Sequence, residues 1–480
     1  MNSSGWEIII GLEVHVELAT KSKIFCSCTT EFGGEANTHC CPICMGMPGT
    51  LPVLNEKVLE FAVKTGLALN CGITRYNKFD RKNYYYPDLP KAYQISQLYL
   101  PSASGGHVDI QTETGVKSIG IHEIHMEEDA GKLVHSEKRG VSYPDYNRCG
   151  VPLLEIVSEP DFRSAEEVIA YLEKVKLIFE YLEISDCKME EGSMRVDVNL
   201  SVRRYGDENL GVRTETKNLN SFRAIKRAIA YESLRQTELL ESGGKIVQQT
   251  RRWDDDAGTG HAMRSKENAQ DYRYFPEPDI PPLLLSEDFI ADIKSGMPEL
   301  AEEKKQRYIK DYGLSEYDAK ILTENKRLSE IFEETAGYCN NAKETANWLI
   351  VEFLSLIKND GAEIKNTKID CKKIASLIKA VTGGVITRPS AKDIFAKIYS
   401  ENIEPEQYIK ENKLDMVSDS DLLYKLCEEA IAEDPSGVQK YKNGNAKVFA
   451  AFVGSVMKKM KGKANTAVVN DILKDMLEKK

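Results

Sequence analysis

Four cysteines near the start of the chain have the spacing of a metal site. Cys26 and Cys28 are one residue apart, Cys41 and Cys44 are two residues apart, and twelve residues separate the pairs. Four thiolates on two such knuckles suit tetrahedral zinc. Since sulfur would fill every coordination position, the predicted zinc is structural. Buried thiols without a metal are the alternative interpretation, and Cys40 leaves the pairing open.

A second possible site consists of carboxylates and a histidine within apolar segments. Glu13 and His15 alternate with apolar residues over 12–18, which is the period of a half-buried strand. Glu155 lies in the apolar run 151–157, and segment 125–129 reads HMEED. Buried carboxylates are costly unless they are paired or neutralised. The pattern therefore fits a magnesium site with oxygen ligands, or carboxylates bonded to nearby Arg and Lys.

Basic residues alternate with tyrosines in segment 79–97, FDRKNYYYPDLPKAYQISQ. Arg81, Lys82 and Lys91 could hold phosphates, while the tyrosine rings could stack on a base. A tyrosine-rich edge of the core would explain the same pattern. The tyrosines concerned are Tyr84, Tyr85, Tyr86 and Tyr93.

Further basic side chains lie on other predicted elements. Lys217 precedes a predicted helix whose N-terminus would favour anions, and Arg195 lies on the polar face of a predicted strand over 194–203. We predict that Arg81, Lys82, Lys217 and Arg195 contact the phosphates of a nucleotide. The chain has no GxxxxGK[ST] loop, no GxGxxG after a strand and no GxSxG elbow. An ATP site here would therefore be unconventional.

The elements that must position these residues change type along the chain. The first 290 residues are dominated by strand patterns, with helical spacing over 164–182 and 221–241. Five prolines between 276 and 298 predict a domain boundary, and the spacing beyond it is helical. A polar, charged stretch over 400–415 is a second candidate linker. With 480 residues, the chain has the length of about three domains.

Charge and hydropathy restrict the class of protein further. The net charge is −11, yet residues 440–480 carry 10 Lys against 3 Asp and Glu, so this tail is strongly basic. A solvated helix or a nucleic-acid contact would each explain the tail. No apolar run is long enough to cross a bilayer, and the N-terminus lacks the features of a signal peptide. We therefore expect a cytoplasmic protein with no membrane partner.

Seven segments, taken in order, resemble one family. The chain is similar to the B subunits (GatB) of the aspartyl/glutamyl-tRNA amidotransferases over essentially its whole length. The departure we note is Thr466, where the family commonly has a proline at the start of a helix. The segments are IGLEVHVEL, FDRKNYYYPDLPKAYQISQ, HMEEDAGK, NRCGVPLLEIVSEPD, KMEEGSMRVDVNLSVR, TETKNLNSFRAIKRAIAYE and DYRYFPEPDIPPL.

The resemblance implies a fold and an activity. The fold is α+β: a mixed, mainly antiparallel-sheet α/β cradle (1–292, with the zinc knuckle), an all-helical domain (293–405) and a small helical tail domain (406–480) that binds tRNA. The activity is ATP-dependent phosphorylation of the side-chain carboxylate of Glu-tRNA(Gln) or Asp-tRNA(Asn), followed by amidation with ammonia. By resemblance, the catalytic residues and Mg²⁺ ligands are His15, Glu128 and Glu155, with Glu13 as a further candidate; strand alternation instead puts Glu127 with His125.

The resemblance also implies partners. The family's glutaminase is a separate amidase subunit (GatA), held with a small third subunit (GatC), and the substrate is mischarged tRNA(Gln) or tRNA(Asn). Two other classes of protein remain open on the residues alone. A zinc-containing tRNA-binding protein without catalysis would leave the strand-borne carboxylates unexplained. A carboxylate ligase acting on a small molecule would leave the basic tail unexplained.

Overall fold

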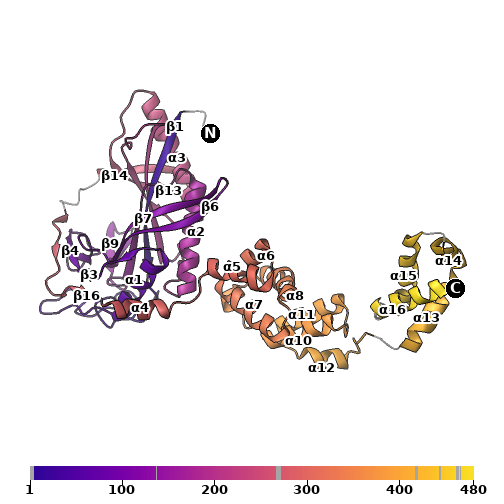
Figure 1. The fold of residues 1–480 in the computed structure, drawn as a ribbon. Helices are drawn as coiled ribbons and strands as arrows, with labels where there is room; N and C mark the ends of the chain where they lie inside the picture. The colour runs from indigo at the N-terminus through magenta and orange to yellow at the C-terminus, as the bar shows by residue number, and fades with distance from the viewer. Residues whose placement is uncertain are drawn as a thin grey trace. The chain divides into compact units, whose positions relative to one another are not determined.

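The computed structural model describes residues 5–136, 138–265, 272–416, 420–442, 445–460, 464 and 466–479. The chain divides into two compact units, Met1–Leu300 and Ala301–Lys480 (Figure 1). Among the described helices, none combines the length and the apolar character that a bilayer crossing requires.

A nine-stranded sheet forms the centre of the first unit. All neighbouring strands are antiparallel except the pair β12 and β13, so the predicted α+β fold with a mainly antiparallel sheet is confirmed. In spatial order the strands are β14 (Thr259–Ser265), β13 (Gln249–Asp254), β12 (Thr214–Leu219), β11 (Met194–Arg204), β1 (Trp6–Glu17), β10 (Pro152–Ser158), β7 (Gly115–Glu128), β6 (Ala103–Thr112) and β2 (Gly72–Ile73).

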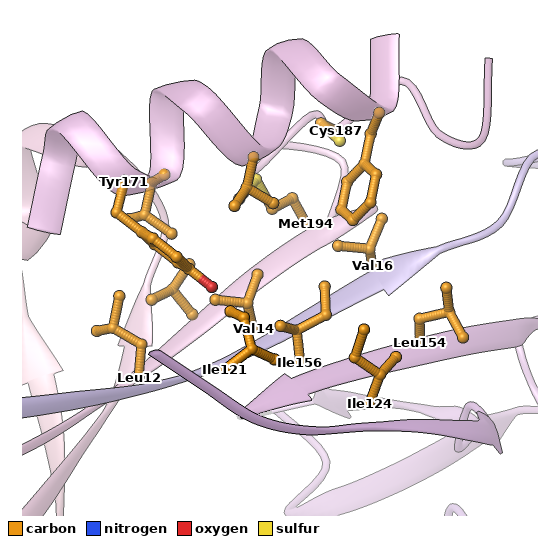
Figure 2. Packing of buried hydrophobic residues seen from close by; sticks show 14 of the residues in the cluster. Leu12, Val14, Val16, Ile121, Ile124, Leu154, Ile156, Tyr171, Cys187 and Met194 are labelled. Carbon is orange, nitrogen blue, oxygen red and sulfur yellow. The ribbon is translucent and has the colours of Figure 1, made fainter. Parts of the chain in front are cut away.

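One face of this sheet is apolar and is covered by helices. Leu12, Val14 and Val16 of β1 are at most 1% exposed and lie under α2 (Ala165–Leu182), which carries Tyr171, as Figure 2 shows. Both predicted helices are confirmed, and the second is α3 (Phe222–Glu241). Ser164 and Ser221 accept hydrogen bonds from the first-turn amides of these helices, which explains where each helix begins. The other face of β1 is therefore left for polar side chains.

Shorter elements complete the first unit around the sheet. The three-stranded sheet β15-β4-β5 carries the tyrosine-rich segment, and α4 packs its buried Ile293 with Val63 of α1. This packing keeps residues beyond 292 with the first unit, which ends at Leu300. The elements are α1 (Glu56–Ala68), β3 (Tyr76–Asn77), β4 (Asp80–Asn83), β5 (Tyr93–Ser96), β8 (Lys132–Ser136), β9 (Val141–Asp145), β15 (Phe275–Pro276), β16 (Leu283–Leu284) and α4 (Glu287–Ser295).

The second unit is helical in every described element, as predicted. Its buried apolar residues form two groups, one within 308–409 and one within 423–477. The helices are α5 (Ala301–Tyr312), α6 (Glu316–Thr323), α7 (Lys326–Cys339), α8 (Ala342–Asn347), a π-helix (Trp348–Phe353), α9 (Leu354–Asp360), α10 (Cys371–Thr382), α11 (Arg388–Glu401), α12 (Pro405–Glu411), α13 (Ser420–Glu433), α14 (Pro435–Lys442), α15 (Phe449–Lys459) and α16 (Thr466–Lys479), with short 3₁₀ turns at Ile364–Asn366 and Ala446–Val448. Thr466 thus begins α16 without the family's proline.

Replacing Glu232 by alanine should destabilise the first unit by about 3 kcal/mol or more. Glu232 on α3 is buried, and its carboxylate accepts bonds from Thr214 (2.7 Å) and Arg235 (2.6 and 2.8 Å). It also lies 3.2 Å from Nε of the buried Arg251, which would lose its carboxylate partner. The midpoint of urea unfolding measures the effect, and the exposed Glu238 on the same helix is the control position.

The stabilisation from Glu232 should also depend on pH in a defined direction. Burial raises the pKa of this carboxyl, but hydrogen bonds from Arg235, Gln236 and Thr214 outweigh burial and hold the pKa below its ordinary value. A lowered folded-state pKa gives stability that is complete above the ordinary value of 4.5 and is lost as the pH falls through the folded value. The stability difference between wild type and Glu232→Ala should therefore shrink only in acid. An equal difference at every pH would contradict this account.

Candidate functional site

Three neighbouring strands bring two histidines and a glutamate into one row on the polar face of the sheet. His15 of β1 is the register partner of Glu155 of β10, and Glu155 is the partner of His125 of β7. Directly opposed residues on adjacent strands share a face. Glu127, two residues after His125, shares that face as well because side chains alternate along a strand.

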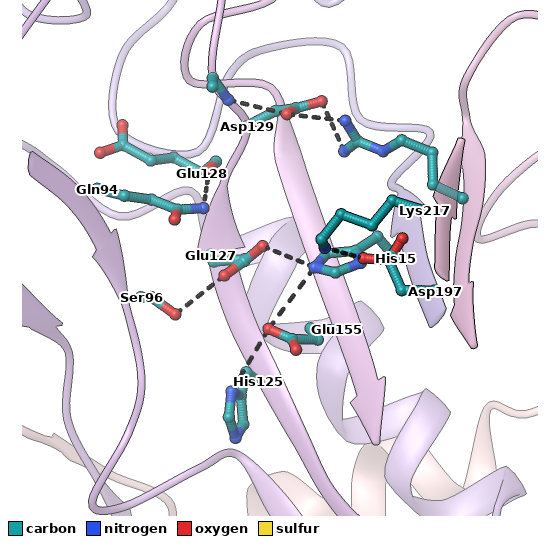
Figure 3. A network of polar contacts seen from close by, with 12 residues as sticks. His15, Gln94, Ser96, His125, Glu127, Glu128, Asp129, Glu155, Asp197 and Lys217 are labelled. Atoms are coloured by element: carbon teal, nitrogen blue, oxygen red, sulfur yellow. Dashed lines mark hydrogen bonds and ion pairs between the residues drawn. The ribbon is translucent and has the colours of Figure 1, made fainter. Parts of the chain in front are cut away.

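The side chains of His15, Glu127 and Glu155 converge within this row, as Figure 3 shows. Nε2 of His15 lies 3.5 Å from a carboxylate oxygen of Glu127 and 3.7 Å from one of Glu155. The other oxygen of Glu127 accepts a bond from the hydroxyl of Ser96 at 3.0 Å. His125 lies on the far side of Glu155, with Nδ1 at 3.8 Å from it. We call His15, Glu127 and Glu155 the triad.

The triad holds the carboxylates of Glu127 and Glu155 close together, and this shifts the pKa values of all three residues. Burial lowers the pKa of His15, but Glu155 and Glu127 outweigh burial and raise it to about 9. Burial and Glu155 raise the pKa of Glu127, while the interaction with His15 holds the pKa of Glu155 below its ordinary value despite burial. A divalent cation would relieve the repulsion between the carboxylates.

The ligand atoms of the triad are close enough together to hold a metal ion. Its ligand atoms lie within 4.8 Å of one another, and two of the three are carboxylate oxygens. Mg²⁺ takes ligands at about 2.0–2.1 Å in octahedral geometry, which places ligand atoms about 3–4 Å apart. The observed distances of 3.5 and 3.7 Å from His15 lie in that range.

Of the ligands implied by the resemblance, the structure brings His15 and Glu155 together but not Glu128. Glu128 is the residue after Glu127, so strand alternation turns its side chain away from the triad. Its carboxylate is buried and accepts bonds from Nζ of Lys91 (2.6 Å) and the amide of Ile95 (2.8 Å). In this arrangement Glu127, and not Glu128, has its carboxylate grouped with His15 and Glu155.

Glu13, the fourth candidate, belongs to a neighbouring acidic group. It lies opposite Asp197 on β11, and the ligand atoms of Glu13, Asp197 and Glu215 lie within 4.8 Å of one another. Burial, with Glu155 nearby, raises the pKa of Glu13. The ammonium of Lys217 bonds Asp197 and lies 3.3 Å from Glu215. The predicted phosphate contact Lys217 therefore already balances part of this negative charge.

Two of the remaining predicted phosphate contacts lie next to the triad. Lys82 is in electrostatic contact with Glu127 and Glu155; burial lowers its pKa, but these anions and Tyr274 outweigh burial and hold it above its ordinary value. Arg195 is the register partner of His15 on β11, and its guanidinium donates to Asp129 at 2.8 and 3.1 Å. Arg195 thus belongs to the polar face that carries the triad, whereas Lys82 belongs to β4 of the three-stranded sheet.

Arg81 has a different environment. Its guanidinium donates to Glu277 at 2.6 and 2.9 Å and to Asp279 at 3.0 Å, and it lies over the ring of Tyr93 at 4.3 Å. A bidentate pair of this kind uses the donors that would otherwise bind phosphate. Arg81 therefore acts in the packing of β4 against the segment around residue 277.

The four predicted cysteines form a second group suited to a metal. The sulfur atoms of Cys26, Cys28, Cys41 and Cys44 lie within 4.8 Å of one another, and those of Cys41 and Cys44 are 3.9 Å apart. Zinc–sulfur bonds of about 2.3 Å in a tetrahedron place sulfurs about 3.8 Å apart. Cys40 is not in this group; its sulfur lies 3.9 Å from the amide oxygen of Asn147.

Several residues of the polar face carry only a weak signal in the sequence. Asp197 and His125 belong to alternating or acidic segments that do not single them out, and no pattern selects Glu215. Period-2 alternation is the available signal, since it puts Asp197 and Arg195 on one face of β11. Alternation alone does not tell which strands are neighbours, and neighbouring strands are what bring Glu215 to Glu13.

Comparisons with known proteins agree with this geometry. Residues 8–291 match the GatB/GatE catalytic domain, and residues 330–477 match the GatB domain. Three relatives are named as the B subunit of aspartyl/glutamyl-tRNA(Asn/Gln) amidotransferase. They come from Lachnoclostridium phytofermentans (58% identical), Caldicellulosiruptor bescii (55%) and Carboxydothermus hydrogenoformans (50%), each covering 99% of both chains. The resemblance is confirmed, and the chain belongs to the GatB family of tRNA-dependent amidotransferase B subunits.

Proposed function

We propose that this chain activates the side-chain carboxylate of Glu-tRNA(Gln), Asp-tRNA(Asn) or both, and then converts it to the amide. A carboxylate oxygen attacks the γ-phosphorus of ATP and ADP leaves; ammonia then attacks the acyl carbon and phosphate leaves. The names of the relatives support this substrate class. The observation that carries the proposal is the triad, a partly buried group of two carboxylates and an imidazole beside the ammonium of Lys82.

His15, Glu127 and Glu155 would hold Mg²⁺ in this reaction. A magnesium ion bound there supplies positive charge against phosphate oxygens. Lys82, Arg195 and Lys217 are the proposed phosphate contacts of the chain itself, because all three cations lie on the polar face of the sheet or next to the triad. Their charge is preorganised by Tyr, Asp and Glu partners, so little reorganisation is needed when phosphate charge develops.

The cysteine group would hold a structural zinc. Its four sulfurs leave no open coordination position for a substrate. The side chain of the buried Lys23 supports the knuckle: its Nζ lies 3.8 Å from the sulfur of Cys44 and donates to the carbonyl of His39 at 2.8 Å. A positive charge beside four thiolates reduces the excess negative charge that a zinc ion leaves there.

The ammonia would come from a separate glutaminase subunit. The relatives are named as subunits, which supports assembly of this chain into a complex of several chains. By resemblance the partners are the amidase subunit GatA and the small subunit GatC, with mischarged tRNA as the substrate.

ATP hydrolysis by the reconstituted complex tests the proposal against the two alternatives. We expect hydrolysis to be stimulated by Glu-tRNA(Gln) or Asp-tRNA(Asn), but not by free glutamate, free aspartate or correctly charged tRNA. A tRNA-binding protein without catalysis would hydrolyse no ATP, whereas a small-molecule ligase would respond to the free amino acid. Assaying both mischarged tRNAs separately identifies the substrate.

The basic tail should contribute to tRNA binding through exposed lysines. Lys447 and Lys458 are exposed in the second unit. Lys447→Gln combined with Lys458→Gln should therefore raise the KM for mischarged tRNA. The salt dependence of binding should flatten by about 0.7–0.9 for each phosphate that the variant no longer neutralises. Lys461 and Lys463 belong to the same basic stretch but lie outside the described residues.

A matched control is available on the same helix. The ammonium of Lys459 is already engaged by Glu429 (3.0 Å) and Glu433 (2.8 Å), so Lys459→Gln should change the salt dependence less. Ending the chain at Met416 should raise the KM further, because it removes the whole basic segment. An unchanged KM and salt slope in that truncation would place tRNA recognition within residues 1–416.

A further inference from the structure

The tyrosines of segment 79–97 fall into two groups that the sequence did not separate. Tyr93 lies against Arg81 (4.3 Å) and Lys91 (5.3 Å), and Tyr84 lies 5.8 Å from the ammonium of Lys82. These two rings are occupied by cations of the protein. Tyr85 also has a cation of the protein beside its ring, Arg273, but it is 78% exposed. Packing within the protein therefore does not explain why an aromatic side chain occupies this position.

A second segment, Tyr272–Tyr274, closes over Lys82. It is brought there by β15, whose Phe275 pairs with Arg81 of β4. The ring of Tyr272 lies 5.1 Å from the ammonium of Lys82 and packs edge-on against Tyr84. Tyr272, which precedes Arg273, thus packs with Lys82 and Tyr84. Tyr274, which follows Arg273, packs against Tyr272 with ring centroids 6.2 Å apart.

The backbone conformation of Arg273 directs its side chain toward Tyr85. Its φ is +48°, in the left-handed region that side chains other than glycine rarely adopt. The side-chain amide of Asn83 donates to its carbonyl at 2.9 Å and holds this conformation. The guanidinium consequently lies 5.8 Å over the ring of Tyr85. Residues in this conformation are found at ligand-binding sites as well as in turns.

Tyr85 and Arg273 together have the chemistry of a seat for an unpaired nucleotide. An exposed ring stacks on a base, and an adjacent guanidinium stacks or binds the phosphate that follows. Tyr85 is three residues from Lys82, so their Cα atoms are at most about 11 Å apart. Lys82 is the register partner of Gln94 on β5, and Ser96, two residues further along β5, donates to Glu127 at 3.0 Å, so a nucleotide seated there is close to the triad.

We propose that Tyr85 and Arg273 seat the 3′-terminal nucleotide of the aminoacyl-tRNA and so position its aminoacyl group beside Lys82 and the triad. This inference rests on the proposed function. The adenine of ATP has the same stacking chemistry, but a small free ligand is normally held in a site that buries most of its surface. The open ring of Tyr85 suits a strand that other contacts already anchor, as the basic tail would do.

Steady-state kinetics of the three-subunit complex, with ammonium chloride as nitrogen donor, tests the seat. Tyr85→Ala should raise the KM for mischarged tRNA about tenfold, since a base stacked on an aromatic ring contributes on that scale. Tyr85→Phe keeps the ring and should behave as wild type. Arg273→Ala should also raise this KM, while the KM for ATP stays unchanged in all three variants.

The matched control is Tyr205→Ala. Tyr205 is 82% exposed in the same unit, but it follows the end of β11 that pairs with Trp6, nine residues along β1 from His15. An unchanged KM for tRNA in Tyr85→Ala overturns the proposed seat. A raised KM for ATP with an unchanged KM for tRNA also overturns it and assigns the ring to the nucleotide. If the wild-type complex forms no amidated tRNA, the proposed function itself has failed, which is a separate result.

Discussion

Glu127→Gln should reduce the rate of amidated tRNA formation by about 10²–10³-fold. The substitution preserves the shape of the side chain but removes one of the two negative charges that face Nε2 of His15. A neutral amide is a much weaker ligand for Mg²⁺ than a carboxylate. Glutamine hydrolysis by the partner glutaminase, measured without tRNA, should survive because its chemistry lies on another chain.

Metal affinity distinguishes Glu127 from Glu128. Titration of the apo complex with Mn²⁺ should show weaker binding in Glu127→Gln and in Glu155→Gln, because both residues belong to the triad. Glu128→Gln should leave the affinity unchanged, since the carboxylate of Glu128 is bonded to Lys91 and the amide of Ile95. The opposite pattern would show that the ligand implied by the resemblance is the correct one.

Cys41→Ser should abolish stoichiometric zinc binding and lower the thermal midpoint of the first unit by about 5–10 °C. Protein never exposed to a chelator should contain about one zinc per chain, because four sulfurs converge within 4.8 Å. A site filled by four sulfurs has no catalytic position. The variant should therefore unfold at a lower temperature than wild type. Below that temperature, its folded fraction should still catalyse the reaction.

Cys40→Ser is the matched control for this prediction. Cys40 is adjacent in sequence, but its sulfur lies against Asn147 and is not a member of the four-sulfur group. We expect wild-type zinc content and a thermal midpoint close to wild type. Equal zinc loss in Cys40→Ser and Cys41→Ser would mean that the pairing is different, and wild-type protein without zinc would contradict the metal site as a whole.

Periodicity and capping residues predicted much of the local structure. The alternation over 12–18 placed His15 and Glu13 opposite Leu12 and Val14, and the sheet has this arrangement. The helices at 164–182 and 221–241 were predicted within one residue of their ends because their caps are local signals. Local sequence also predicted the four-cysteine group, whose members lie within nineteen residues of one another.

The choice between Glu127 and Glu128 required the tertiary structure. Both residues are acidic and adjacent, and alternation says only that they face opposite sides of β7. Which side carries the site depends on β10 pairing between β7 and β1, and β1 is more than a hundred residues away from both in the sequence. The resemblance pointed to Glu128, while the register points to Glu127.

The environments of the cations likewise depend on long-range interactions. Arg81 and Lys82 are adjacent on β4, so their side chains point to opposite faces. The sequence analysis predicted both of them as phosphate contacts. Glu277, almost two hundred residues away, takes the donors of Arg81, whereas Lys82 is left beside Glu127 and Glu155. Sequence by itself determined which residues alternate, cap and cluster locally. Strand order and register, which depend on burying one complete face of the sheet, determined which of them meet.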